Sequence, residues 1–217
     1  MTSLAERFLS EPVRQKIREA VREAEKRTSG EILPLVVSTS YDYPVADMIA
    51  GLVFGLPAAL ALDYFLAGRL WLNDPHHLFF LGLLAFCFLF FHQICGRIPP
   101  VKRWFISQRE MAEEVEEAAA IQFLEEGLHT TRDGTGVLIF ISVFERRVRV
   151  LADHGISEKI PREQWDRIVH IITDGIKQGN QAEGVRMAVR EAGQMLETHF
   201  PVRTDDTNEL ADLRIKS

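Results

Sequence analysis

Two long apolar segments, residues 45–67 and 78–96, stand out in a chain whose other apolar positions occur singly or in short runs. A bilayer core takes roughly 20 mostly apolar residues for each helical span, and both segments meet that requirement. The residues that separate them, 68–77, are enough to turn a helical hairpin and too few to form a domain. The pattern therefore predicts a two-helix transmembrane hairpin, residues 45–96, in the middle of the chain.

Outside the hairpin, apolar residues follow the periods of helices and strands. Helical spacing covers residues 11–27 and 107–127, and it returns in two helices that close the domain. Two continuous apolar runs, residues 31–38 and 135–143, are typical of buried strands. A third strand, residues 147–153, alternates only partly, and it is predicted to be a less buried antiparallel partner of the second strand.

The order of these elements predicts an α/β fold, in which helices sandwich a small mixed sheet of about three or more strands. Residues 1–44 are too short to build a core alone, so we expect them to form one discontinuous domain with residues 97–200. The first two strands would be parallel with a right-handed crossover, and the hairpin is inserted in that crossover. Residues 201–217 are predicted to form a polar tail.

Charge and cysteine content narrow the partners and the compartment. The net charge of −6 offers no basic field for nucleic acid, so a nucleic-acid partner is not expected. Cys87 and Cys95 both lie in the second apolar segment and form no disulfide framework. The N-terminus lacks a basic start followed by an apolar run, so it is not predicted to be a signal peptide.

Basic residues near the spans predict the orientation of the hairpin. The turn holds only Arg69, whereas a cluster follows the second segment. This cluster consists of Arg97, Lys102, Arg103 and Arg109. By the positive-inside rule, both termini are predicted to lie in the cytoplasm.

The first apolar segment carries small residues four apart, namely Gly51, Gly55 and Ala59. A face of small residues lets membrane helices approach closely, so it favours packing against the second segment, self-association or a membrane-protein partner. Asp63 is costly in lipid, but it lies near the outer end of the segment, where local water can solvate it. Transport is disfavoured, because two spans with peripheral polar groups make no pathway without high oligomerisation.

Strand and turn motifs in this chain resemble those of the TPM domain family, in its bacterial form with two membrane spans. They are residues 28–32 (TSGEI), 135–142 (TGVLIFIS) and 149–156 (RVLADHGI), followed by Trp165 and a long helix pair. The resemblance covers most of residues 10–200. It implies an α/β sandwich around a small mixed sheet, here in the bacterial inner membrane.

Family members include thylakoid proteins linked to photosystem repair and a receptor-auxiliary membrane protein. Acid phosphatase activity and calcium binding have been proposed within the family. The acidic loop associated with the thylakoid members is absent here, where residues 8–12 (FLSEP) stand in its place. Neither activity therefore transfers to this chain by motif.

The predicted sheet places three acidic residues, Glu31, Asp133 and Asp153, at one end, because the third strand runs antiparallel to the first two. Three carboxylates there can hold a hard cation such as calcium. Alternatively, they are solvated strand-end and loop residues. His154 is the most site-like histidine, although a turn residue would also be found there. The sequence contains no G-x-x-x-x-G-K-[ST] loop, no H-E-x-x-H and no G-x-S-x-G motif.

The leading hypothesis is a membrane-anchored TPM-like domain that acts as an accessory or regulatory interaction module for membrane proteins. The alternative is a low-activity, metal-dependent phosphatase of the acid type or a calcium-binding domain that uses Glu31, Asp133 and Asp153. No catalytic residue is assigned from the sequence, and calcium is the one cofactor considered. The expected contacts are the lipid bilayer and a membrane-protein partner or a second copy.

Overall fold

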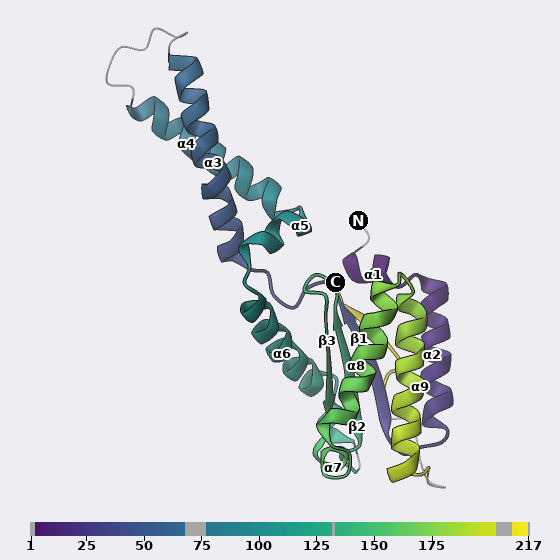
Figure 1. The fold of residues 1–217 in the computed structure, drawn as a ribbon. Coiled ribbons are helices and arrows are strands. Elements are labelled where there is room, and N and C mark those ends of the chain that lie inside the picture. Colours follow the sequence, from purple (N-terminus) through teal and green to yellow (C-terminus); the bar gives the residue numbers. More distant parts are fainter. Residues whose placement is uncertain (1–2, 68–76, 132, 203–209, 217) are drawn as a thin grey trace. The chain divides into compact units, whose positions relative to one another are not determined.

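A computed structural model describes residues 3–67, 77–131, 133–202 and 210–216 (Figure 1). The chain divides into two compact units. Met1–Tyr41 and Ala112–Ser217 form the α/β unit, and Asp42–Met111 forms the helical unit. Arg69 and most of the predicted hairpin turn lie outside the described residues.

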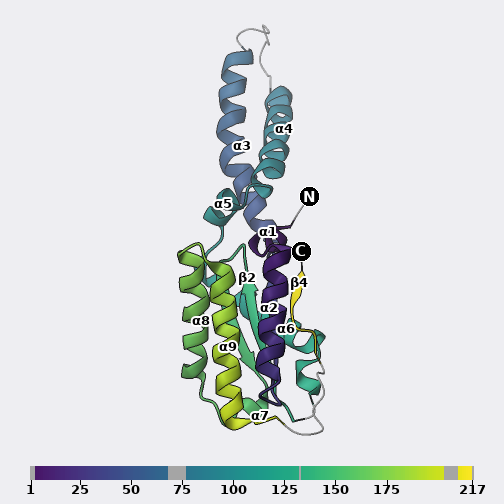
Figure 2. The same cartoon turned by 90° about the vertical axis from the view of Figure 1, so that its right-hand side faces the viewer.

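Within the described residues, the α/β unit contains a four-stranded sheet in the order β3-β2-β1-β4 (Figure 1; β4 is labelled in Figure 2). Its strands are β1 Glu31–Val37, β2 Gly136–Ser142, β3 Arg147–Ala152 and β4 Arg214–Lys216. β1 is parallel to β2 and β4, whereas β2 is antiparallel to β3. The predicted α/β fold with a mixed sheet is confirmed, and so are the directions of its first three strands.

One face of the sheet is covered by a layer of three long helices (Figure 2). They are α2 Glu11–Glu25, α8 Arg162–Lys177 and α9 Gln181–His199. The short helices α1 Leu4–Phe8 and α7 His154–Ser157 lie at opposite ends of this unit. Ser3 caps α1, because its hydroxyl accepts a hydrogen bond from the Glu6 N–H while the Glu6 carboxylate accepts from the Ser3 N–H.

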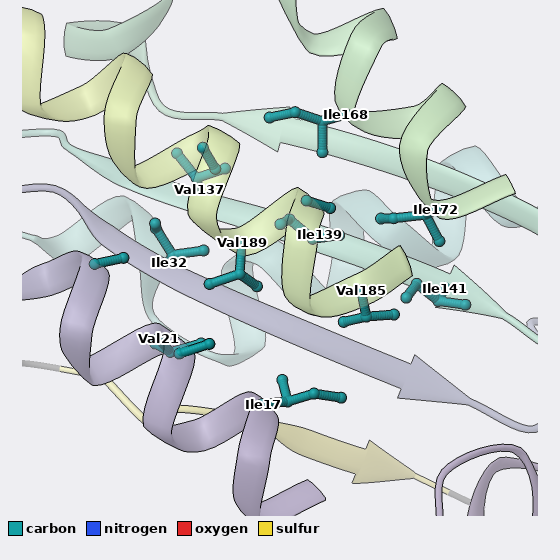
Figure 3. Packing of buried hydrophobic residues seen from close by; sticks show 14 of the residues in the cluster. Ile17, Val21, Ile32, Val137, Ile139, Ile141, Ile168, Ile172, Val185 and Val189 are labelled. Atoms are coloured by element: carbon teal, nitrogen blue, oxygen red, sulfur yellow. The ribbon is translucent and has the colours of Figure 1, made fainter. Parts of the chain in front are cut away.

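Branched apolar side chains fill the space between these helices and the sheet (Figure 3). The helices contribute Ile17, Val21, Ile168, Ile172, Val185 and Val189, and the strands contribute Ile32, Val137, Ile139 and Ile141. All of them are almost fully buried. Burial of one such side chain stabilises the fold by about 1.5–3 kcal/mol, so this cluster is the main core.

The opposite face of the sheet packs against α6 Gln108–Glu125 and the short helix η2 Leu128–Thr130. Val115 and Ala119 of α6 meet Leu33, Leu35 and Phe140 of the sheet. Successive strand residues point to opposite faces, and both faces are covered here. This double burial explains why β1 and β2 appear in the sequence as continuous apolar runs.

β4 comes from the segment that the sequence predicts to be a polar tail. Its three residues pair with residues 35–37 of β1, and Leu213 just before it is buried. Ion pairs hold the strand at Glu126, the residue that follows α6. Its Oε2 lies 3.0 Å from Arg214 Nε, and its Oε1 lies 2.8 Å from Lys216 Nζ. Residues 210–216 therefore belong to the fold rather than to a loose tail.

Pro34 lies within β1 at a position where its missing N–H leaves the strand pairing intact. The Glu31 N–H donates to the Thr135 carbonyl on the β2 side at 3.0 Å. N–H groups alternate between the two edges of a strand, so the Pro34 nitrogen faces the other edge. β4 covers that edge only at residues 35–37. The proline therefore removes no hydrogen bond from the ladder.

The helical unit contains the two predicted apolar helices, α3 Pro44–Ala67 and α4 His77–Gly96. Both are long and apolar enough to cross a membrane. The chain continues into α5 Pro99–Lys102 and the short helix η1 Arg103–Phe105. Phe54 connects these parts, with its ring centroid 6.0 Å from that of Phe91 and 5.9 Å from that of Phe105.

The small-residue face of α3 lies against α4. A Cβ atom on Gly55 would lie 3.0 Å from the backbone of Phe88, and one on Gly51 would lie 3.1 Å from the Cβ of His92. Ala59 continues this face and is fully buried. Glycine at these positions allows the close approach of the two helices.

An ion pair joins the first turn of α3 to α5. Asp47 Oδ2 lies 2.8 Å from Lys102 Nζ, and the two side chains are 18% and 13% exposed. The Lys102 ammonium also donates to the Asp42 carbonyl. A Cβ atom on Gly96 would lie 3.2 Å from Asp47 Oδ1, so the end of α4 passes close to this pair. The sequence shows both charges but not this pairing.

Candidate functional site

The end of the sheet where β1 begins and β3 finishes brings together most of the predicted acidic residues. The Glu31 N–H donates to the Thr135 carbonyl at 3.0 Å, and the Asp153 N–H donates to the neighbouring Gly136 carbonyl at 2.9 Å. Asp133 lies in the turn before β2, and a Cβ atom on Gly155 would lie 2.6 Å from its carbonyl oxygen. All three predicted residues thus lie at the same sheet end.

Asp153 is held at this end by the start of α7. Its carboxylate accepts a hydrogen bond from the His154 N–H at 2.7 Å, as an N-cap does. The same oxygen, Oδ1, lies 3.1 Å from Nδ1 of the His154 ring. Oδ2 is buried and has no hydrogen-bond partner in the part of the chain that the structure describes. Asp153 therefore presents an acceptor oxygen that a cation, a proton or a water could use.

Glu31 makes different contacts. It is 7% exposed, and its side chain hydrogen-bonds with that of Glu25 at the end of α2. The pKa of Glu25 is raised to about 8, with burial as the largest cause. The hydrogen bond from the Ile32 N–H lowers it, and the charges of Glu31 and Asp212 contribute to the rise. Glu31 therefore lies beside a carboxyl, that of Glu25, whose raised pKa keeps it protonated at neutral pH.

A surface cavity of about 510 Å³ lies at the same sheet end. Its ionisable lining residues are Asp133, His154, Glu158, Lys159 and His199. Lys159 Nζ lies 4.3 Å above the centroid of Phe200, which also lines the cavity. The sequence interpretation included Asp133 and His154 but missed the other three. Glu158 follows His154 by about one helical turn, so the sequence could have indicated it. His199 lines the cavity because of how α9 packs, which the sequence does not show.

No three His, Cys, Asp or Glu side chains in the described residues are arranged to hold a metal ion. Glu31 and Asp153 do not line the cavity, whereas Asp133 is exposed and does. The three residues thus share a sheet end without converging on one point. A calcium site formed by Glu31, Asp133 and Asp153 stays a prediction.

A second polar cluster lies at the opposite sheet end, around Glu145 in the turn between β2 and β3. Glu145 is 2% exposed. Its Oε1 accepts hydrogen bonds from the Ser40 N–H at 3.0 Å and from the Thr39 hydroxyl at 3.2 Å, and its Oε2 accepts from the Ser142 hydroxyl. This carboxylate thus attaches Thr39 and Ser40, which follow β1, to the turn between β2 and β3. Sequence reasoning did not identify it, because the turn itself carries no distinctive motif.

These observations define an α/β sandwich domain whose chain is interrupted, between its first two strands, by a pair of long apolar helices. The TPM domain family model matches residues 104–195. This match contains the motifs at residues 135–142 and 149–156 and confirms the resemblance that they indicate.

Among solved structures, the chain is similar to the NMR structure of the BA42 protein from the psychrophilic bacterium Bizionia argentinensis sp. nov.. The two chains share 22% sequence identity with a TM-score of 0.59, over 97% of this chain and 96% of the other. At this identity the similarity shows a shared fold. None of the curated proteins matches this chain.

Proposed function

We propose that this protein is a membrane-anchored TPM-like domain that acts as an accessory or regulatory interaction module for membrane proteins. Its place is the bacterial inner membrane, with two spans and both termini in the cytoplasm. The cluster Arg97, Lys102, Arg103 and Arg109 after α4 supports this orientation through the positive-inside rule.

The observation that carries the proposal is the outward face of the hairpin. On α3, one stripe of large residues at four-residue spacing is exposed throughout, and it consists of Met48, Leu52, Leu56, Leu60 and Tyr64. On α4, Leu81, Phe86, Leu89 and Phe90 are likewise exposed. A continuous apolar surface of this kind requires lipid or a membrane partner to cover it.

The surface left for a partner is the one that the two helices do not use to pack against each other. Gly51, Gly55 and Ala59 already lie against α4, so the close approach that small residues permit is taken up within the chain. We therefore place the partner on the outward stripe of α3 rather than on the small-residue face.

Photo-crosslinking in the native membrane tests this proposal. A photoreactive side chain replaces Leu52 or Leu60 on the outward stripe, and Ile121 of the α/β unit serves as an exposed apolar control. The expected result is one defined protein adduct from the stripe positions, with a membrane protein or a second copy, and none from position 121. Lipid adducts alone at both stripe positions, with no protein retained in mild detergent, would contradict the interaction role.

A fusion experiment tests the orientation separately. Reporters that are active only in the cytoplasm or only in the periplasm are fused after Ser217, and the cytoplasmic reporter should be the active one. Activity of the periplasmic reporter would refute the proposed topology.

A second candidate function, binding of calcium with or without a weak metal-dependent phosphatase activity, is favoured by the buried Oδ2 of Asp153. A ligand that binds only the native state must raise its stability, so calcium should raise the melting temperature if it binds there. Asp153→Asn should abolish that shift, and His199→Gln controls for a nearby change in the cavity. Phosphatase activity that survives Asp153→Ala would exclude this carboxylate from the reaction.

A further inference from the structure

The sheet of the α/β unit ends at β3, and one edge of this strand is open (Figure 1). The Asp153 N–H, just after β3, donates to the Gly136 carbonyl at 2.9 Å, so it points towards β2. N–H groups alternate between the two edges of a strand, so those of Val148 and Val150 point away from β2. In the part of the chain that the structure describes, nothing hydrogen-bonds with the open-edge N–H or carbonyl of either valine.

The edge of β3 lacks the usual protection against further pairing. Sheet edges are commonly blocked by a proline, a bulge or an inward-pointing charge. β3 contains no proline, and its pairing with β2 is continuous from Arg147 to Ala152. A surface groove of about 250 Å³, lined by residues 148–152, follows this edge between α6 and α8. The open stretch ends at Ala152, whose carbonyl accepts from the Ser157 hydroxyl at 3.1 Å.

The two walls of the groove differ in chemistry. On the α8 side, Trp165 lines the groove together with Val148 and Val150, and all three belong to the main apolar core. On the α6 side, the groove is lined by Arg149 and Glu116, whose charged atoms lie 3.0 Å apart. Side chains of an added strand would alternate between these two walls. One set would therefore meet apolar groups, and the other would meet Arg149.

The charge of β3 favours acidic residues on that second set. Arg147 and Arg149 lie on the same face of the strand, which contains no acidic residue. Glu116 is 67% exposed, so its ion pair with Arg149 contributes little. Arg162 and Asp166 also line the groove, and their opposite charges offset each other. A carboxylate directly opposite Arg149 on an added strand would be close enough to attract it.

We propose that the open edge of β3 binds an extended segment of a partner protein as a fifth strand, in which apolar residues alternate with acidic ones. Backbone hydrogen bonds to Val148 and Val150 hold this segment. Its apolar side chains pack beside Trp165, and its carboxylates face Arg149. This surface shares no residue with the outward stripe of α3, so either proposal can fail without the other.

Peptide binding to the full-length protein in lipid nanodiscs tests this proposal. The probe is a capped peptide in which valine and glutamate alternate, and the same peptide with lysine in place of glutamate is its control. In the free protein, the amides of Val148 and Val150 should exchange hydrogen rapidly, whereas those of Arg149 and Leu151 should exchange slowly. The glutamate peptide should slow exchange at both valines, and the lysine peptide should not.

Three results would overturn the proposal. They are no protection of the two valines by the glutamate peptide, equal protection by both peptides, and protection without peptide in discs that hold two copies. The last result would mean that a second copy of this chain occupies the edge.

Substitutions in β3 separate strand addition from unspecific peptide binding. Val150→Pro removes an N–H that faces the open edge and none that faces β2, so it should abolish binding while β2 stays protected. Arg149→Glu should weaken binding of the glutamate peptide by about fivefold or more and favour the lysine peptide. Arg167→Glu, on α8 outside the groove, should change neither.

A modified peptide covers the case in which Val150→Pro unfolds the sheet. Methylation of alternate backbone nitrogens in the glutamate peptide removes the donors that face β3, so this peptide should not bind to the unmodified protein. Undiminished binding of the methylated peptide, or of the glutamate peptide to a folded Val150→Pro protein, would refute the addition of a strand.

Discussion

The ion pair between Asp47 and Lys102 gives a sharp test of what holds the helical unit together. Both side chains are less than one-fifth exposed, and their charged atoms lie 2.8 Å apart. Lys102→Met removes the cation but keeps most of the apolar stem. It leaves the Asp47 carboxylate beside Gly96 without this partner, which typically costs about 3–5 kcal/mol for a buried pair.

The two cysteines of the chain supply the assay. Cys95 is 5% exposed and lies near Asp47, whereas Cys87 is 3% exposed and lies two turns earlier on α4. Labelling with a membrane-permeant maleimide, resolved for each thiol by mass spectrometry, reports local opening of the unit. A loss of about 3 kcal/mol should speed the labelling of Cys95 by roughly a hundredfold.

The double variant Asp47→Leu/Lys102→Met tests whether the unpaired charge causes this loss. It removes both charges and keeps a branched side chain at position 47, so most of the protection of Cys95 should return. Gly82→Ala, in a stretch of α4 where an added Cβ meets no atom within 4 Å, controls for unrelated changes in the helix. If the double variant labels as fast as Lys102→Met, an uncompensated charge is not the cause and the reasoning fails.

Three further predictions concern single positions. Gly134→Ala should lower the melting temperature more than Gly179→Ala. Both glycines have a positive φ, which costs an L-residue roughly 1–2 kcal/mol. Only a Cβ atom at position 134 would also meet the His154 ring, at 2.6 Å. Equal shifts would disprove that contact. Gly55→Leu should separate α3 from α4 and accelerate maleimide labelling of Cys87, whereas Gly82→Leu should not. Burial raises the pKa of Glu126, but hydrogen bonds and charges from Lys216 and Arg214 outweigh it, so the pKa is lowered. The stabilisation that the ionised Glu126 gives to β4 is lost as the pH falls through this lowered pKa, so β4 should lose hydrogen-exchange protection in acid. Glu126→Gln should abolish that acid dependence.

The larger features of the fold could be predicted from the sequence because each depends on a local pattern. Residues 31–38 and 135–143 are apolar on both faces, and the structure buries β1 and β2 between two helical layers. The lengths of the apolar segments predicted α3 and α4 to within a few residues. Parallel pairing of β1 with β2 followed from the helix placed between them.

The missed features depend on contacts between residues far apart in the chain. β4 is three residues long, which is too short to show a hydrophobic period. It forms because it pairs with the edge of β1 and because Lys216 makes an ion pair with Glu126. Placing Glu31 at the sheet end was correct, but its partner Glu25 is set by how α2 packs on β1. Lys159 and His199 likewise line one cavity although they lie far apart in the chain.

Ser38, the first residue after β1, gathers contacts from three parts of the α/β unit. Its N–H donates to the Lys216 carbonyl at 3.1 Å, its carbonyl accepts from the Phe144 N–H at 3.0 Å, and its hydroxyl accepts from the Ala5 N–H at 3.1 Å. The Glu145 carboxylate then accepts hydrogen bonds from the next two residues, Thr39 and Ser40. The chain from here to Pro44 leads directly into α3.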